Sequence, residues 1–208
     1  MTEKGEQVRG TVSGPANAAS DTAQRNRPRW DDLPVPDDTA NLREGPDLHE
    51  QCLGLLPLVG VWRGTGEVVY PTIDGPFHFG QQLVFAHDGR PFLSYEATAW
   101  LLGPDGEVLR PAARETGFWR PQPDGALEVM IAHATGIMDL FYGRVRNLTS
   151  WEIETDAVMR TASAKEVVGS HRLYGIVDGG DLAYVDERAM VGQPLQPHLS
   201  ARLHRVAG

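Results

Sequence analysis

The sequence predicts an all-β fold, an antiparallel up-and-down barrel of about ten strands, on three observations. Beyond residue 60, short runs rich in Val, Leu, Phe, Tyr and Trp are separated by Gly, Pro and Asp, which is typical of many short antiparallel strands. Gly-containing segments at 103–107, 122–125 and 178–181 separate neighbouring runs as hairpin turns do. Closing a sheet of this size removes its exposed edges, and such barrels enclose a ligand pocket at one mouth.

Residues 1–45 are predicted to be a disordered tail that precedes one barrel domain over residues 46–208. The tail is dominated by Pro, Asp, Asn, Ala, Thr and Arg, so it cannot bury enough apolar area to offset its ordering entropy. Trp30, with Pro34 and Pro36 close by, is expected to be solvent exposed. The tail contains neither an apolar signal core nor a stretch of about 20 apolar residues, so we expect no targeting or anchoring segment.

A short helix is expected over residues 47–58, limited by a proline and a glycine at its end. Helical spacing places Leu48, Cys52, Leu55 and Leu56 on one side, which predicts a lid or plug against the barrel. The expected strands then follow in order over residues 61–69, 77–87, 91–102, 114–120, 126–134, 136–146, 149–158, 165–176, 182–191 and 197–206.

Charge and cysteine content restrict the function classes. Nineteen Lys and Arg against 28 Asp and Glu give a formal charge of −9, which repels phosphate backbones and anionic membranes. Nucleic acid and membranes are therefore not expected partners. Cys52 is the only cysteine, which excludes internal disulfides and fits a reducing compartment, so a cytoplasmic location is expected.

The first expected strand opens with the pattern Gly60-x-Trp62-x-Gly64-x-Gly66. Glycines at alternating positions let the strand bend and let another backbone approach, and the tryptophan can close the base of the barrel. We interpret these four residues as a packing motif rather than as catalytic residues.

An ordered set of motifs resembles the nitrobindin family over roughly residues 55–206. The matching segments are 60–66 (GVWRGTG), 70–73 (YPTI), 85–93 (FAHDGRPFL), 115–118 (ETGF), 132–136 (AHATG), 164–167 (AKEV) and 193–199 (QPLQPHL). The resemblance implies a ten-stranded barrel, shaped like the lipocalins and fatty-acid-binding proteins, with one haem b per chain in an open apolar cavity. It also implies His198 as the axial iron ligand, and Thr72 and Lys165 as further residues of the haem pocket.

The function implied by the resemblance is that of a peroxynitrite isomerase, which converts peroxynitrite to nitrate at ferric haem and binds nitric oxide there. A neutral imidazole is a good axial donor that leaves the opposite face of the iron free, so no catalytic residue is expected beyond the iron. The alternative is a non-enzymatic carrier of a fatty-acid-like ligand in the same cavity. A third class is an interaction module that works through its tail and Trp30. The resemblance also allows a homodimer.

The residues around His198 permit two orientations of its side chain. Strict alternation along residues 197–206 places Leu199 and Leu203 on one face and His198 with Ser200 on the other, which favours solvent exposure. Alternation is least reliable at a strand entrance next to proline, and a barrel mouth can present polar groups inward. The resemblance favours this second orientation, in which His198 is an iron ligand.

Overall fold

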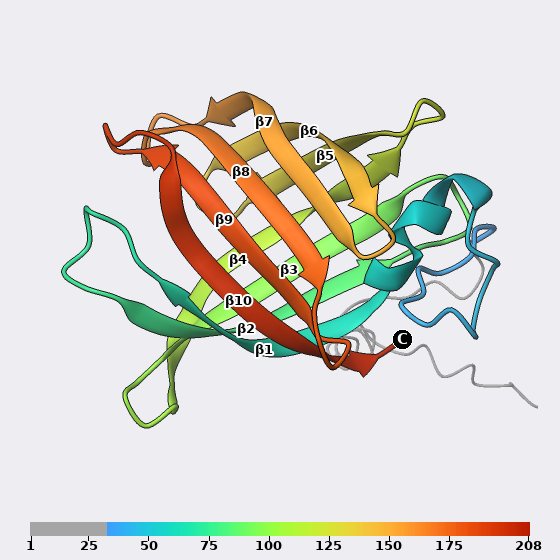
Figure 1. The fold of residues 1–208 in the computed structure, drawn as a ribbon, viewed down its shortest axis with the longest axis horizontal. Helices are drawn as coiled ribbons and strands as arrows, with labels where there is room; N and C mark the ends of the chain where they lie inside the picture. The colour runs from blue at the N-terminus through green and yellow to red at the C-terminus, as the bar shows by residue number, and fades with distance from the viewer. Residues whose placement is uncertain (1–32) are drawn as a thin grey trace, which may run out of the picture. The chain divides into compact units, whose positions relative to one another are not determined.

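The computed structural model describes residues 33–208, and within them residues 36–208 form one compact unit. This unit is a closed barrel in which each strand pairs antiparallel with its neighbours in sequence and β1 also pairs with β10 (Figure 1). The predicted fold is therefore confirmed. The described elements are η1 (Glu50–Leu58), β1 (Gly60–Val68), β2 (Phe77–Ala86), β3 (Leu93–Leu102), β4 (Val108–Pro121), β5 (Ala126–His133), β6 (Ile137–Asn147), β7 (Ser150–Arg160), β8 (Val167–Ile176), β9 (Leu182–Met190) and β10 (Gln196–Ala207).

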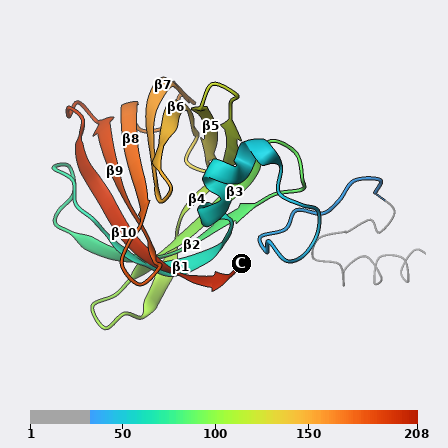
Figure 2. The ribbon, with the colours of Figure 1, turned by 45° about the vertical axis from the view of Figure 1, so that its right-hand side comes forward.

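The up-and-down order gives the barrel two different ends. The loops β1–β2, β3–β4, β5–β6, β7–β8 and β9–β10 lie at one end, which we call the mouth. The 3₁₀ helix η1 lies at the opposite end, as Figures 1 and 2 show. All five loops that connect an odd-numbered strand to the next strand therefore surround the mouth.

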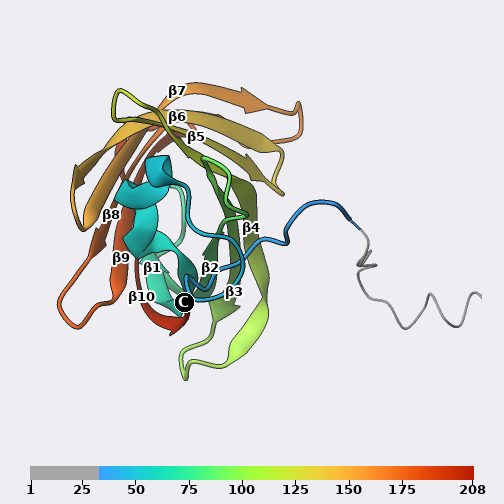
Figure 3. The ribbon, with the colours of Figure 1, turned by 90° about the vertical axis from the view of Figure 1, so that its right-hand side faces the viewer.

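The 3₁₀ helix η1 plugs the end opposite the mouth (Figure 3). Trp151 donates its Nε1–H to the carbonyl oxygen of Gly54 at 2.8 Å, which ties β7 to the helix. Cys52, Leu55 and Leu58 are fully buried, in agreement with the predicted plug. The expected burial of Leu56 was wrong, since its side chain is 39% exposed. A 3₁₀ helix has three residues per turn, so positions three apart share the inner face.

The strand bounds differ from the expected ones by at most two residues, except for β4, which begins at Val108 instead of residue 114. The extra segment contains Pro111, and proline within a strand is tolerated only where its missing N–H is not needed for pairing. In the structure Pro111 opposes Trp100 of β3, beside a register shift, while pairing with β5 begins only at Glu115. This part of β4 is paired on one side only, so the missing N–H of proline is tolerated.

The glycine and tryptophan motif packs β1 against its neighbours, with Trp62 beside η1 at the closed end of the barrel. Trp62 is fully buried, donates its Nε1–H to the carbonyl oxygen of Leu58 at 2.8 Å, and lies 4.1 Å under the guanidinium of Arg205. A side chain at Gly64 would overlap the backbone of β10, and one at Gly66 would overlap both β10 and an aromatic ring of β2. Close contact between β1 and its two neighbours therefore depends on glycine at these positions.

Part of the predicted tail lies outside the described residues, including Trp30. Residues 36–45, which the sequence placed in the tail, belong to the same compact unit as the barrel. Thr39 and His87 exchange two backbone hydrogen bonds of 2.8 and 2.9 Å, and Ser94 donates its hydroxyl to Asp38 at 2.6 Å. In residues 33–208 no helix has the length and apolar character needed to cross a membrane.

Candidate functional site

A cavity of about 490 Å³ opens at the mouth of the barrel, and this volume is within the range of small-molecule sites. One wall is apolar and comes from β2, β3 and β4; it is formed by Phe77, Phe79, Ala99, Leu101, Ala112 and Ala113. The remaining lining is mostly polar and comes from several strands; it includes Gln81, Arg110, Glu115, Arg172, Tyr184, Asp186 and His198. The cavity thus combines an apolar wall with a small number of polar groups.

His198 lines this cavity because β10 contains a β-bulge where it enters the barrel. Pro197 pairs with Glu187 and Leu199 pairs with Asp186, so His198 is an extra residue without its own partner on β9. An extra residue interrupts the alternation of inward and outward side chains. Both His198 and Leu199 consequently line the cavity, and the histidine side chain is only 18% exposed. The outward orientation that alternation favoured does not occur.

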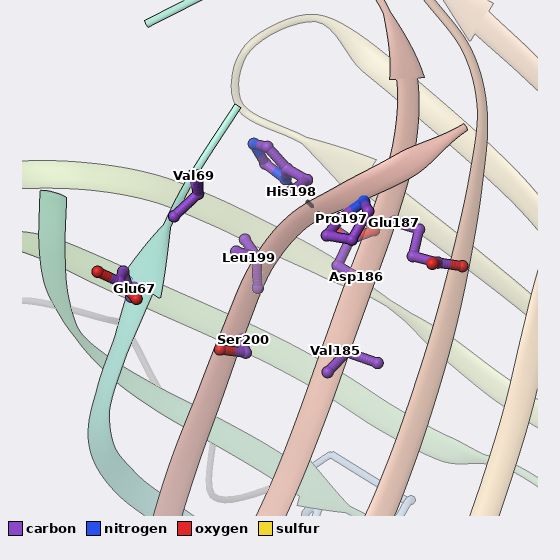
Figure 4. A pocket seen from close by; sticks show the side chains of 9 residues that line it. All are labelled: Glu67, Val69, Val185, Asp186, Glu187, Pro197, His198, Leu199 and Ser200. Carbon is purple, nitrogen blue, oxygen red and sulfur yellow. Dashed lines mark ion pairs between the residues drawn. The ribbon is translucent and has the colours of Figure 1, made fainter. Parts of the chain in front are cut away.

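The imidazole of His198 is held between two side chains. Its Nδ1 atom is buried, has no hydrogen-bond partner among the described residues, and lies 3.9 Å from Oδ2 of Asp186 on β9 (Figure 4). The ring of Tyr70 packs edge-on against it, with 5.6 Å between ring centroids. The hydroxyl of Tyr70 accepts the backbone N–H of Met190 at 3.1 Å. Nδ1 of His198 therefore faces the Asp186 carboxylate. The ring also packs against Tyr70, which is hydrogen-bonded to β9.

A second, smaller pocket of about 330 Å³ also includes His198, and it shares Asp186 and Leu199 with the cavity. Its lining comes from the end of β1, the middle of β9 and the start of β10, and Figure 4 shows these residues: Glu67, Val69, Val185, Asp186, Glu187, Pro197, His198, Leu199 and Ser200. Val69 and Val185 are exposed, so this pocket faces outward. His198 thus separates the interior cavity from the outer surface.

A buried ion-pair network forms the polar side of the cavity. Arg172 donates two hydrogen bonds to Glu115, of 2.9 and 3.0 Å, in a bidentate arrangement. Its Nε atom lies 3.4 Å from Asp186, which also accepts hydrogen bonds from Arg188 at 3.0 Å and from the hydroxyl of Ser170 at 2.7 Å. Arg172, Arg188 and Asp186 are each at most 7% exposed. Buried charges of opposite sign are therefore paired.

The same network changes the acidity of its members. Burial alone would raise the pKa values of Glu115 and Asp186. Arg172 and His133 outweigh it at Glu115, and Arg188 and Arg172 are the main groups that outweigh it at Asp186, so both pKa values lie below their ordinary range. Burial would lower the pKa of His133, yet its hydrogen-bond contacts with Asp139 and Glu115 raise that pKa overall. Nε2 of His133 lies 2.9 Å from Asp139 and Nδ1 lies 3.3 Å from Glu115. Two carboxylates therefore stay ionised against the cavity.

Thr72 and Lys165 lie at the mouth but not in the cavity. Thr72 is exposed in the β1–β2 loop and Lys165 is exposed in the β7–β8 loop, so both share the barrel end of His198. Neither lines the cavity as residues 33–208 define it. The structure thus places all three expected pocket residues at one end and brings only His198 into the cavity wall.

Sequence reasoning missed the ion-pair network and the role of Tyr70. Arg172 and Asp186 each lie two positions from a buried tyrosine on the same strand, Tyr174 and Tyr184. Residues two apart in a strand face the same side of the sheet. A charged residue two positions from a buried aromatic residue on the same strand therefore indicated a charge inside the barrel.

Three comparisons relate the chain to known proteins. Residues 51–205 match the family model described as THAP4-like, heme-binding beta-barrel domain. A ferric nitrobindin-like protein of Saccharopolyspora erythraea is 51% identical, with 100% of both chains covered. A peroxynitrite isomerase of Mycobacteroides abscessus is 54% identical over 88% of this chain and 92% of its own. The crystal structure of Rv2717c from M. tuberculosis superposes with a TM-score of 0.67 and 38% identity, covering 76% of this chain and 99% of that one.

Proposed function

Because the chain belongs to the THAP4-like, heme-binding β-barrel family, we propose that it binds haem b at His198, isomerises peroxynitrite to nitrate and binds nitric oxide. The observation that carries this proposal is the position of His198, which lines an apolar-walled cavity with one ring nitrogen turned toward a buried carboxylate. Relatives at 52–54% identity bear the name peroxynitrite isomerase, which supports the reaction.

The residues of the cavity fit a porphyrin with one axial histidine. The wall formed by β2, β3 and β4 is apolar and includes Phe77 and Phe79, which suits a flat apolar macrocycle. Nδ1 of His198 is the buried ring nitrogen, so Nε2 is the nitrogen available to a metal. Histidine ligands commonly direct their second nitrogen to a carboxylate in this way.

The chain's own contribution to the reaction is positioning and control of access. His198 would hold the iron, and the bound haem would supply a ferric centre able to take up a small ligand. The apolar wall around Phe79 would disfavour water in that part of the cavity. Lys165 and Thr72, exposed at the mouth, are suited to meet the haem carboxylates by charge and by hydroxyl donation.

The alternative function, a fatty-acid-like carrier, is less well supported by the charges in the cavity. A carrier of this kind would need a cation for the ligand's carboxylate inside the barrel. Arg172 and Arg188 are buried beside the cavity and already pair with Glu115 and Asp186, whereas Arg110, which also lines the cavity, is exposed near its mouth. Releasing either buried arginine would leave a buried carboxylate unpaired, which is strongly unfavourable.

The experiment is a hemin titration followed in the Soret region with wild-type protein and with His198→Ala. We expect saturable one-to-one binding that is lost or shifted in the variant. His204→Ala is the matched control, because His204 is exposed on the same strand and should leave binding unchanged. Equal binding by His198→Ala and wild type would rule out His198 as the ligand.

A second measurement addresses the reaction itself. The hemin-loaded wild-type protein should accelerate peroxynitrite decay and raise the yield of nitrate relative to the apoprotein, and His198→Ala should not. The ferric protein should also change its Soret spectrum reversibly on addition of nitric oxide. If the haem-loaded protein does not accelerate peroxynitrite decay, the isomerase activity is excluded while the haem site still stands.

A further inference from the structure

We propose that Asp186 is a positioning residue for the iron ligand, accepting the Nδ1–H of His198 and so directing Nε2 of the ring to the cofactor. This inference rests on the haem site proposed above. Asp186 neighbours His198 across β9 and β10, and Oδ2 of Asp186 lies 3.9 Å from Nδ1. The bulge that turns His198 into the cavity is the same irregularity that sets its ring beside this carboxylate.

Nδ1 of His198 has no other acceptor among the residues that the structure describes. It is buried and makes no hydrogen bond. A separation of 3.9 Å is about 1 Å longer than an N–H···O hydrogen bond, so a small rotation of the ring closes it. Such hydrogen bonds are often long before the bound partner is in place. The edge-on contact with Tyr70 keeps the ring from turning toward solvent instead.

The carboxylate of Asp186 is itself fixed in place. It is 1% exposed, the Ser170 hydroxyl donates to Oδ1 at 2.7 Å, and Arg188 donates to Oδ2 at 3.0 Å. Arg172 approaches the same oxygen to 3.4 Å. Side chains of β8 and β9 therefore hold this carboxylate beside His198 of β10, and its Oδ2 atom has little freedom to move away.

Accepting this hydrogen bond would have two chemical consequences. It fixes the tautomer with the proton on Nδ1, so the Nε2 lone pair is available to iron. It also gives the imidazole partial anionic character, which strengthens the bond to iron and favours the ferric state over the ferrous state. The two arginines share the charge of the carboxylate and moderate this effect. Asp186 would thus tune the reduction potential as well as orient the ligand.

The test compares Asp186→Asn with Ser170→Ala after loading with hemin. Asparagine keeps the shape but removes the anionic acceptor, so hemin affinity should fall by about 10-fold to 100-fold, and the ferrous iron–histidine stretching frequency should decrease. If ferric affinity falls about tenfold more than ferrous affinity, the midpoint potential rises by about 59 mV. Ser170→Ala removes a neighbour of the other carboxylate oxygen and should change these three quantities far less.

A measurement on the unaltered protein covers the case in which Asp186→Asn does not fold. In the ferric cyanide complex, the His198 Nδ1–H should give a hyperfine-shifted proton resonance that exchanges slowly into D₂O. Fast exchange of this proton would overturn the inference, as would equal changes in Asp186→Asn and Ser170→Ala. If wild-type protein binds no hemin, or binds it without His198, the haem proposal fails together with this one. Fast proton exchange, or equal changes in the two variants, would overturn only the role of Asp186 and leave the haem site intact.

Discussion

Replacing Glu115 by glutamine is a direct test of the buried ion pair beside the cavity. The substitution keeps the shape of the side chain but removes the charge that faces Arg172 across hydrogen bonds of 2.9 and 3.0 Å. Arg172 is 2% exposed, so its charge cannot be hydrated in compensation. Removing one partner of a buried pair costs about 3–5 kcal/mol, and because Asp186 remains 3.4 Å from Nε of Arg172, we expect a loss at the lower end, about 3 kcal/mol. That is a large part of the roughly 5–15 kcal/mol that stabilises a typical domain.

Urea unfolding, followed by the fluorescence of the buried tryptophans, measures this loss. A loss of about 3 kcal/mol lowers the midpoint by about 1–3 M urea for ordinary slopes. Glu128→Gln is the matched control, because the Arg120–Glu128 pair at 2.9 Å lies on the surface, where such pairs contribute about 0–1 kcal/mol. Equal midpoints for the two variants would refute the argument, since Arg172 would then be stabilised by something other than Glu115.

Three further predictions concern other parts of the barrel. Burial opposes ionisation of Glu115 and Asp186, but Arg172 with His133 at Glu115, and Arg188 with Arg172 at Asp186, outweigh it and lower the two pKa values from 4.5 and 3.8. This stabilisation is present above the ordinary pKa values and is lost as pH falls through the lowered ones, so urea midpoints should begin to drop as pH falls from about 5 to 3 and should fall further in stronger acid; constant midpoints would contradict this. Trp62→Phe leaves the Leu58 carbonyl without its 2.8 Å hydrogen bond and should lower the free energy of unfolding in urea by about 1–3 kcal/mol. An unchanged urea midpoint would exclude a stabilising role for that hydrogen bond. Burial raises the pKa of Cys52 to about 11, so a thiol reagent at neutral pH should label it only after unfolding in urea, and rapid labelling of the native protein would show that η1 opens.

The fold could be predicted from the sequence because strand and turn signals are local. The glycine turns and the runs of β-branched and aromatic residues located the strands to within two residues, apart from the start of β4. The failure there has a tertiary cause, since proline is acceptable only because β5 does not pair with that part of the strand. The error at Leu56 arose from assuming 3.6 residues per turn for a helix that has three.

The site could be predicted only in part. The family motif indicated His198, whereas the alternation of side chains pointed it to solvent. A bulge depends on the register between β9 and β10, which no single strand encodes. The partners of Asp186 come from β8, from β9 itself and from β10, so most of these contacts depend on the register between neighbouring strands and could not be inferred from spacing along one strand. The sequence feature that indicated a buried Asp186 was its position two residues after Tyr184 on the same strand.

The pairing of β1 with β10 determines when the barrel can close during synthesis. Val68 pairs with Leu199, so the barrel closes only after the ribosome has released nearly all of the strands. Until then β1 and β9 present open edges, which are prone to pairing with other chains. Contacts so distant in sequence also slow folding. Since β10 carries His198 as well, the strand that closes the barrel also supplies the proposed haem ligand, and a nascent chain could not capture its cofactor early.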